Sequence, residues 1–145
     1  MKNYGYDCVQ GDCQKFSLKK KFDIVFAGEL IEHLENQGMF LDCAKNHLKE
    51  KGLLILTTPN QFSILRAIAN LFGILNENHE HVLVHNKETI KHLLERKGFK
   101  LQKIGHFTNP SFYNVGRLKI LRKITKPLLE TMFKIRPQLS HQILI

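Results

Sequence analysis

Residues 22–60, FDIVFAGELIEHLENQGMFLDCAKNHLKEKGLLILTTPN, decide how the chain folds. The apolar runs at 22–27 and 53–58 are rich in β-formers, which is typical of strands buried on both faces of a parallel sheet. Between them lies one apolar helical face, formed by Met39, Phe40, Cys43, Ala44 and Leu48. Lys49, Lys51 and Gly52 should close this helix, and Pro59 should end the second strand because proline cannot donate to a ladder. This order predicts a right-handed βαβ unit.

Apolar spacing predicts further elements on both sides of this unit. Strands are expected at 6–10, 99–107 and 141–145, the last of them antiparallel. Helices are expected at 62–72, 87–97, 115–125 and 128–135, with Pro127 separating the last two. The whole chain, 1–145, is therefore expected to be one α/β domain.

Composition narrows the class of protein. The chain has 145 residues, of which 43% are hydrophobic, and it contains no apolar run near the roughly 18–20 residues of a membrane span. Its N-terminus lacks the apolar core of a signal peptide. Three cysteines at irregular spacing predict reduced thiols and a cytoplasmic location rather than disulfides or a zinc site. The net charge of +9 can attract nucleic acid, anionic lipid or an anionic cofactor, without choosing among them.

Four segments carry a resemblance when they are taken in order: FDIVFAGELIEHL (22–34), LKEKG (48–52), LLILTTPN (53–60) and HEHVLVHNKETIKHLLERKGF (79–99). The ordered set resembles the second half of a class I S-adenosylmethionine-dependent methyltransferase of the ubiquinone type. The family's glycine-rich cofactor loop would precede residue 1. We therefore expect a truncated Rossmann-like sheet, whose activity as this chain alone is doubtful.

The resemblance implies a seven-stranded sheet in the order 3-2-1-4-5-7-6. This chain would supply strands 3 to 6 and part of strand 7, with a basic helical insertion at 108–137 before the last strand. The edge of strand 4 would be bare, which invites self-association or pairing with a partner chain. Alternatively, the strand at 6–10 folds back beside strand 4.

The resemblance also implies a cofactor site for S-adenosylmethionine. Asp12 would face the adenine amino group, and the backbone of Ala27 and Gly28 would lie against the methionine portion. Read without the resemblance, Gly11-Asp12 is ordinary turn punctuation, and Gly28 is a turn residue as well.

Glu29, Glu32 and His33 form an ExxEH pattern that would share one face of a helix. With His81 or His79 they could bind a divalent cation, which would lower the pKa of a substrate hydroxyl. In methyltransferases that this chain resembles, those acting on ubiquinone-type precursors and on small-RNA 3′ ends, the pattern is linked to a magnesium-type ion. Alternatively, His33 and Glu32 act as acid–base or substrate contacts without metal. A third possibility is that the carboxylates only stabilise a helix N-terminus.

The function predicted from the sequence is an S-adenosylmethionine-dependent methyltransferase, O-directed, with a small-molecule or lipid-like substrate. The competing class is a non-enzymatic α/β remnant that acts as an interaction module. Its basic amphipathic arm, 115–136, would contact an anionic membrane or, less favourably, nucleic acid. That arm can equally be an ordinary surface helix with a solvated face.

Overall fold

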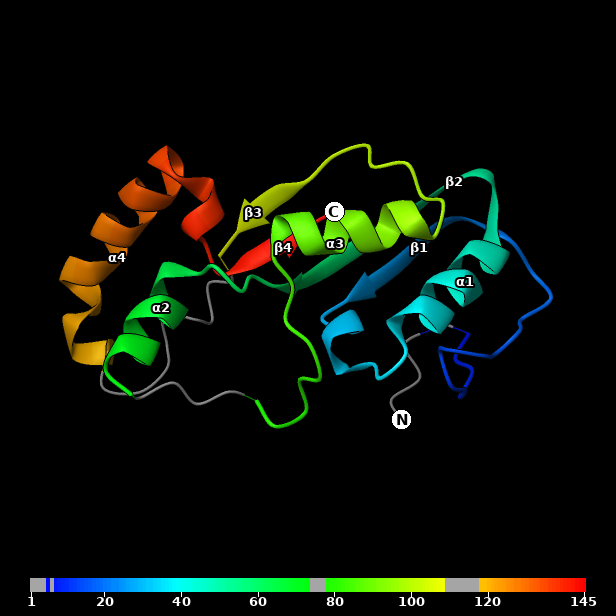
Figure 1. Cartoon of the computed structure of the whole chain (residues 1–145), viewed down its shortest axis with the longest axis horizontal. Coiled ribbons are helices and arrows are strands. Elements are labelled where there is room, and N and C mark those ends of the chain that lie inside the picture. Colours follow the sequence, from blue (N-terminus) through cyan, green and yellow to red (C-terminus); the bar gives the residue numbers. More distant parts are fainter. Residues whose placement is uncertain (1–4, 6, 74–77, 109–117) are drawn as a thin grey trace.

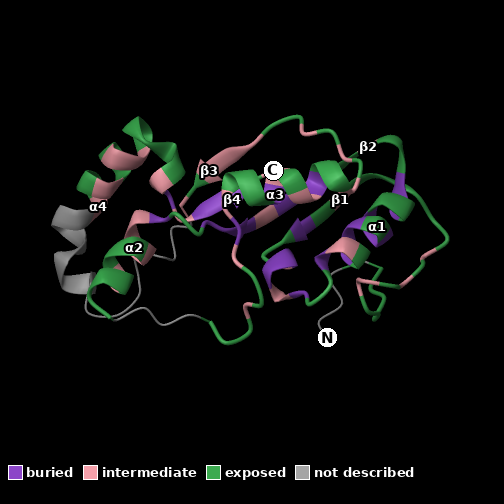
Figure 2. Ribbon diagram, in the orientation of Figure 1, coloured by how far each residue is buried: buried purple, intermediate pink, exposed green. Residues whose placement is uncertain are grey.

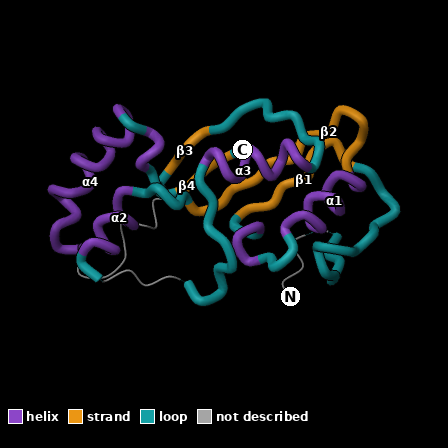
Figure 3. The backbone as a smooth tube through the Cα atoms, in the orientation of Figure 1, coloured by secondary structure: helices purple, strands orange, loops and turns teal. Residues whose placement is uncertain are grey.

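The computed structural model describes residues 5, 7–73, 78–108 and 118–145, with no account of the side chains of 118–125. The elements in chain order are β1 (Phe22–Gly28), η1 (Ile31–His33), α1 (Gln37–His47), β2 (Leu48–Pro59), α2 (Ile64–Leu71), α3 (Lys87–Arg96), β3 (Gly105–Phe107), α4 (Leu118–Ile135), η3 (Pro137–Leu139) and β4 (Gln142–Leu144). Figure 1 shows them along the chain, and Figure 3 shows that the strands form one sheet.

The sheet has the order β1-β2-β4-β3. β1 and β2 are parallel, with Ala27 opposite Leu56, and β4 runs antiparallel to both β2 and β3. This confirms the predicted βαβ unit, the antiparallel last strand and the expected order of strands 4, 5, 7 and 6. In the described part of the chain β1 is an edge strand, because only β2 pairs with it.

Helices α1 and α3 cover one face of this sheet (Figure 2). Ala27 and Leu56 point toward that face, since they are directly paired neighbours, and they pack with residues of both helices. The buried cluster comprises Ala27, Ile31, Leu34, Phe40, Leu41, Ala44, Leu56, Ile90 and Leu94. The prediction that both strands are buried on two faces is wrong for β1, where Ile24 and Phe26 are exposed. Within the described residues, the covering helices α1 and α3 lie on the face of the sheet that carries Ala27 and Leu56.

Local hydrogen bonds set the ends of the two covering helices. Asn36 caps α1 by accepting from the backbone N–H of Met39 at 3.0 Å. α1 ends at His47, earlier than the predicted close at 49–52, because Leu48 already begins β2. Asn86 and Thr89 form a reciprocal capping box at the start of α3, which satisfies backbone donors that a helix leaves unpaired.

Three expected elements differ from the observed ones. Residues 7–10 form no strand, and residue 6 lies outside the described residues. A segment with an alternating side-chain pattern is stabilised as a strand by pairing with a neighbouring strand. No strand lies beside 7–10 in the described structure. The strand predicted at 99–107 is confined to Gly105–Phe107.

The expected break at Pro127 is also wrong, because α4 runs through it from Leu118 to Ile135. Proline removes one backbone donor, but this loss does not end α4. In the next turn the Thr131 hydroxyl donates to the Pro127 carbonyl at 2.9 Å. Residues 115–117 of the expected arm lie outside the described residues. None of the helices described is both long enough and apolar enough to span a bilayer.

Candidate functional site

The candidate site lies where β1 and β2 end. In open α/β sheets, ligands bind outside the carboxyl ends of the strands. β1 ends at Gly28, and the short helix η1 (Ile31–His33) follows it directly. Thr58, near the end of β2, is fully buried and donates its hydroxyl to Glu32 Oε2 at 3.1 Å. The two strand ends are therefore linked through the carboxylate of Glu32.

Glu32 is the most unusual group in the site. Its side chain is fully buried, and among the described residues Oε1 has no hydrogen-bond partner. Burial raises the pKa of the Glu32 carboxyl above its ordinary value, and the nearby charge of Glu29 also raises it. A buried carboxylate oxygen without a donor is costly, so this position suits a proton or a cation.

Two histidines face this carboxylate. His33 Nδ1 donates to the Glu80 carbonyl at 3.0 Å, which leaves Nε2 as the nitrogen with a lone pair, 4.0 Å from Glu32 Oε1. The rings of His33 and His81 meet edge to face, with centroids 4.8 Å apart. One ligand atom each from Glu32, His33 and His81 lie within 4.8 Å of one another.

The loop that carries His81 is fixed by the backbone. The N–H groups of Val82 and Leu83 both donate to the carbonyl of Glu32, at 2.8 and 3.2 Å. The N–H of His81 donates to the Asn78 carbonyl at 2.9 Å. These bonds hold residues distant in sequence against η1, so the three side chains meet without help from a ligand.

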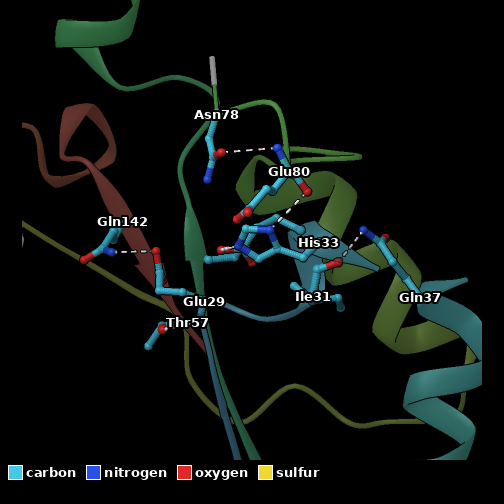
Figure 4. A network of polar contacts seen from close by, with 10 residues as sticks. Glu29, Ile31, His33, Gln37, Thr57, Asn78, Glu80 and Gln142 are labelled. Atoms are coloured by element: carbon cyan, nitrogen blue, oxygen red, sulfur yellow. Dashed lines mark hydrogen bonds and ion pairs between the residues drawn. The ribbon is translucent and has the colours of Figure 1, made fainter. Parts of the chain in front are cut away.

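Glu29 does not join this group in the structure. It has a positive φ of 49°, an uncommon backbone conformation for a residue other than glycine. Its N–H donates to the Thr57 carbonyl at 3.0 Å, and its Oε2 accepts from Gln142 Nε2 at 2.8 Å. Figure 4 shows Glu29 paired with Gln142 on β4, while His33 turns toward Glu80. The expected shared helical face is absent because η1 begins only at Ile31.

The residues expected to hold the cofactor are separated into two environments. Ala27 is buried in the sheet, and Gly28 lies so close to Phe26 that a Cβ at Gly28 would be 2.9 Å from its ring. Asp12 is exposed and accepts from the Gln14 N–H at 3.0 Å, a turn contact that lowers the pKa of its carboxyl. The structure gives Asp12 no contact with the strand ends among the described residues, so its cofactor role stays a prediction.

An open cavity of about 680 Å³ lies beside that turn, between residues 14–21 and α1. Lys15, Lys19, Lys20 and Lys21 line it together with Cys43 and His47. Its lining does not include Glu32 or His33, so this cavity and the titratable cluster are different places.

Sequence reasoning missed the residues that position η1. Gln37 donates from Nε2 to the Ile31 carbonyl at 2.9 Å, and its Oε1 lies 2.9 Å from Nε2 of the buried His85. Burial lowers the pKa of His85, which favours its neutral form. Thr58 was missed as well. The one sequence signal for this positioning role was that Gln37 is a polar residue within an amphipathic segment.

Comparisons with known proteins place these features in context. The sequence profile of a family described as "Methyltransferase domain" matches residues 2–104. The ubiquinone biosynthesis O-methyltransferase of mitochondria from Rattus norvegicus is 30% identical over 96 residues, covering 61% of this chain and 28% of that protein. The Homo sapiens protein of the same name is also 30% identical over 96 residues, covering 61% and 26%. The chain thus spans about a quarter of the length of these relatives.

Solved structures share the fold. An S-adenosylmethionine-dependent methyltransferase from Archaeoglobus fulgidus superposes with a TM-score of 0.58 at 20% identity, covering 94% of this chain and 65% of that one. The small RNA methyltransferase HEN1 superposes with a TM-score of 0.59 at 18% identity, covering 92% of this chain and 15% of that one. The α/β architecture with flanking helices is therefore Rossmann-like.

Proposed function

Because the chain belongs to the methyltransferase domain family, we propose that it forms the acceptor side of an S-adenosylmethionine-dependent O-methyltransferase site. The matched residues, 2–104, contain β1, η1 and the loop that carries His81. The relatives are O-methyltransferases, which supports transfer to oxygen. The methionine end of the cofactor would approach the backbone at Gly28, where β1 ends.

The observation that carries this proposal is the unsatisfied Oε1 of Glu32, buried and faced by His33 and His81. One carboxylate and two imidazoles fit a divalent cation. Carboxylates suit Mg²⁺ and Mn²⁺, whereas imidazoles suit the transition metals. The mixed set therefore favours a cation such as Mn²⁺ over the Mg²⁺ that the sequence pattern predicted. When bound, such a cation lowers the pKa of an acceptor hydroxyl and orients it.

The protein's own groups would prepare this site before any ligand arrives. Thr58 holds one oxygen of Glu32, and the Glu80 carbonyl fixes the His33 tautomer so that Nε2 is available. A hydrogen bond from the second ring nitrogen to a carbonyl is the usual support for a metal-binding histidine. In the absence of a cation, His33 Nε2 is also placed to accept a proton from an acceptor hydroxyl. Methyl transfer itself is a direct displacement that depends mainly on alignment.

An apolar acceptor, small or lipid-like, suits the surroundings. The side chains of Val82 and Leu83 are exposed, although their backbone is bonded to Glu32. On α2 and at the residue that caps its C-terminus, Ile68, Leu71 and Phe72 form an exposed apolar stripe at helical spacing. α4 carries five basic residues and one acidic residue, which would favour contact with an anionic membrane surface.

The proposal is tested by titrating the purified 145-residue chain with Mn²⁺ and following the free ion by electron paramagnetic resonance. We expect saturable binding that Mg²⁺ displaces only weakly, and loss of binding in Glu32→Gln and His81→Ala. Glu29→Gln and His79→Ala are matched controls, because neither residue belongs to the cluster in the structure. Equal binding by all variants would contradict the metal site.

Calorimetric titration with S-adenosylhomocysteine tests the cofactor part separately. Binding by the folded chain supports the enzyme. A folded chain that binds neither this product nor Mn²⁺ would contradict the enzyme and favour the interaction module. For that alternative, the exposed α2 stripe and the basic α4 would be the functional surface.

A further inference from the structure

The loop at residues 14–21, which leads into β1, is fixed against α1. The N–H of Leu18 donates to Nε2 of His47 at 3.0 Å, and the Cys43 thiol donates to the Phe16 carbonyl at 3.3 Å. The rings of Phe16 and His47 stack, with their centroids 4.8 Å apart and an angle of 22° between their planes. Figure 1 shows the loop beside α1. The loop therefore has a defined conformation, although most of its residues are exposed.

Three consecutive lysines of this loop, residues 19–21, have no counterion. Their side chains are exposed, and within the part of the chain that the structure describes no acidic side chain pairs with them. Asp42, which borders the loop on α1, is already paired with Lys97. Asp12 is already paired with Lys15, whose Nζ lies 3.4 Å from its Oδ2. Three neighbouring positive charges repel one another, and an anion bound among them would offset that repulsion.

The backbone brings all three lysines to one cavity. In an extended segment, successive side chains point to opposite sides. Lys19 has a positive φ of 52°, which is uncommon for a residue other than glycine and which bends the chain at this point. Lys19, Lys20 and Lys21 all line the open cavity of about 680 Å³ beside α1. Backbone strain of this kind costs on the order of 1–2 kcal/mol and is concentrated at ligand-binding and active sites.

The cavity has the size and the lining of a small-molecule site. Its volume of about 680 Å³ falls within the roughly 300–1,000 Å³ of ligand pockets. Phe16 and Met39 contribute apolar surface, and Met39 is 44% exposed. The hydroxyl of Ser17 and the amide of Asn46 also line it, and neither has a hydrogen-bond partner among the described residues. The free polar groups of the lining are therefore mostly hydrogen-bond donors, which suits an anion.

The lining favours phosphate groups as the anion. A lysine ammonium is a compact point charge that binds phosphate, whereas planar carboxylates are matched better by the fork of an arginine. A chain of linked phosphates carries adjacent negative charges, as three neighbouring ammonium groups require. A nucleic acid would need cations that continue beyond the cavity. The next lysines along the chain are engaged, because Lys45 donates to the Lys97 carbonyl and Lys49 is paired with Asp23.

We propose that residues 19–21 and the cavity beside α1 bind a small molecule with two or more linked phosphates, either a free polyphosphate or the phosphate chain of a nucleotide. The lysines contact the phosphates, while Phe16 and Met39 offer apolar surface to the rest of a nucleotide. This site is not the proposed methyl-transfer site, because its lining includes neither Glu32 nor His33. S-adenosylmethionine carries a net positive charge, so the lysines would repel it. The proposal therefore does not rest on the proposed function.

The test is calorimetric titration of the 145-residue chain, without divalent cations, with inorganic triphosphate, ATP and adenosine. We expect saturable binding of triphosphate and ATP but not of adenosine. The affinity should fall on the order of 10-fold between 50 and 200 mM NaCl, because several ion pairs form on binding. Tighter binding of ATP than of triphosphate would identify a nucleotide as the ligand, and equal affinity would identify a free polyphosphate.

Two triple variants separate this site from the general positive charge of the chain. The variant that carries K19Q, K20Q and K21Q should bind triphosphate at least about 10-fold more weakly than wild type. The matched control removes the same charge from three exposed lysines outside the cavity and should change the affinity less than about 2-fold. It carries K87Q, K100Q and K103Q. Circular dichroism checks that both variants are folded, and Mn²⁺ binding should be the same in both.

No binding of triphosphate by the folded wild-type chain would overturn the proposal. Equal weakening in the two triple variants would do so too, because the net charge of +9 alone would then account for the binding. A third contrary result is tighter binding of a single-stranded oligoribonucleotide than of ATP at equal phosphate concentration, which would indicate a nucleic-acid surface. Loss of Mn²⁺ binding with triphosphate binding intact would contradict the proposed function and leave this site standing.

Discussion

The two faces of the sheet are built from the same strands and the same kinds of residue, yet the side chains of one face are buried and many of those on the other are exposed. Ala27 and Leu56 are buried under α1 and α3, while Phe26 and Leu53, on the other side of the same strands, meet solvent. The difference lies in what the chain places next to each face. Both covering helices, α1 and α3, pack on one side. Strands that are apolar on both sides are fully buried only when a layer packs on each face of the sheet. The described residues supply one such layer, helices α1 and α3.

The largest effect expected from this comparison is on the free energy of unfolding. Leu56→Ala removes a 1% exposed side chain from the helix-covered face and should cost about 2–5 kcal/mol. Leu53→Ala, three residues earlier and 50% exposed, should cost less than about 1 kcal/mol. Urea denaturation of the two variants and of wild type measures both costs. Similar costs for the two variants would show that the two faces are not distinguished by burial.

A smaller effect on the free energy of unfolding is expected at Glu32, whose side chain is fully buried at the ends of β1 and β2. Its raised native pKa means that the native state binds more protons than the unfolded state between the unfolded and native pKa values. The free energy of unfolding should therefore fall as pH rises through that window, and it should stay lowered above the native pKa.

Glu32→Gln removes this cost. In the absence of divalent cations, the variant should be more stable than wild type at pH 7 by roughly 1–3 kcal/mol, the usual cost of a buried group without a partner. The difference should vanish below the unfolded pKa of about 4.5. Thermal unfolding at several pH values tests the sign. Destabilisation by Glu32→Gln at neutral pH would mean that the carboxylate is satisfied within the protein.

Much of this fold could be predicted from the sequence because its signals are local. The periodicity of 22–60 gives the strand, helix and strand, and the apolar positions of 87–97 give α3. The error at 7–10 has a physical cause: a strand is stabilised by its neighbours, and in the described structure none pairs with these four residues. The early end of α1 follows from Leu48, an apolar residue that suits both a helix and a strand.

The candidate site could be predicted only in part. Glu32, His33 and His81 were identified from residue type, and the structure brings them together. Glu29 was expected beside them, but the positive φ at this position turns its carboxylate toward Gln142, and helical spacing cannot reveal such a turn. Thr58 and His85 contact residues that lie 26 and 48 positions away. Such contacts depend on tertiary packing, so a local pattern does not encode them.

The smallest expected effect separates a helix that covers the sheet from one that does not. At the N-terminus of α3, Asn86 Oδ1 accepts from the N–H groups of Glu88 and Thr89 at 2.9 and 3.0 Å. At the N-terminus of α2, Ser63 makes no such bond, and among the described residues its buried hydroxyl has no partner. Asn86→Ala should cost about 1 kcal/mol of unfolding free energy.

Ser63→Ala should be neutral or slightly stabilising, because it removes a buried polar atom that has no partner in the described structure. The same denaturation assay compares the two variants, and Asn86→Ser, which retains a capping oxygen, should recover most of the loss. If Ser63→Ala proves the costlier change, then α2 contributes more to the folded state than the helix covering the core. In that case α2, although its apolar residues are exposed, would have to be counted with the helices of the covered face as an element that stabilises the fold.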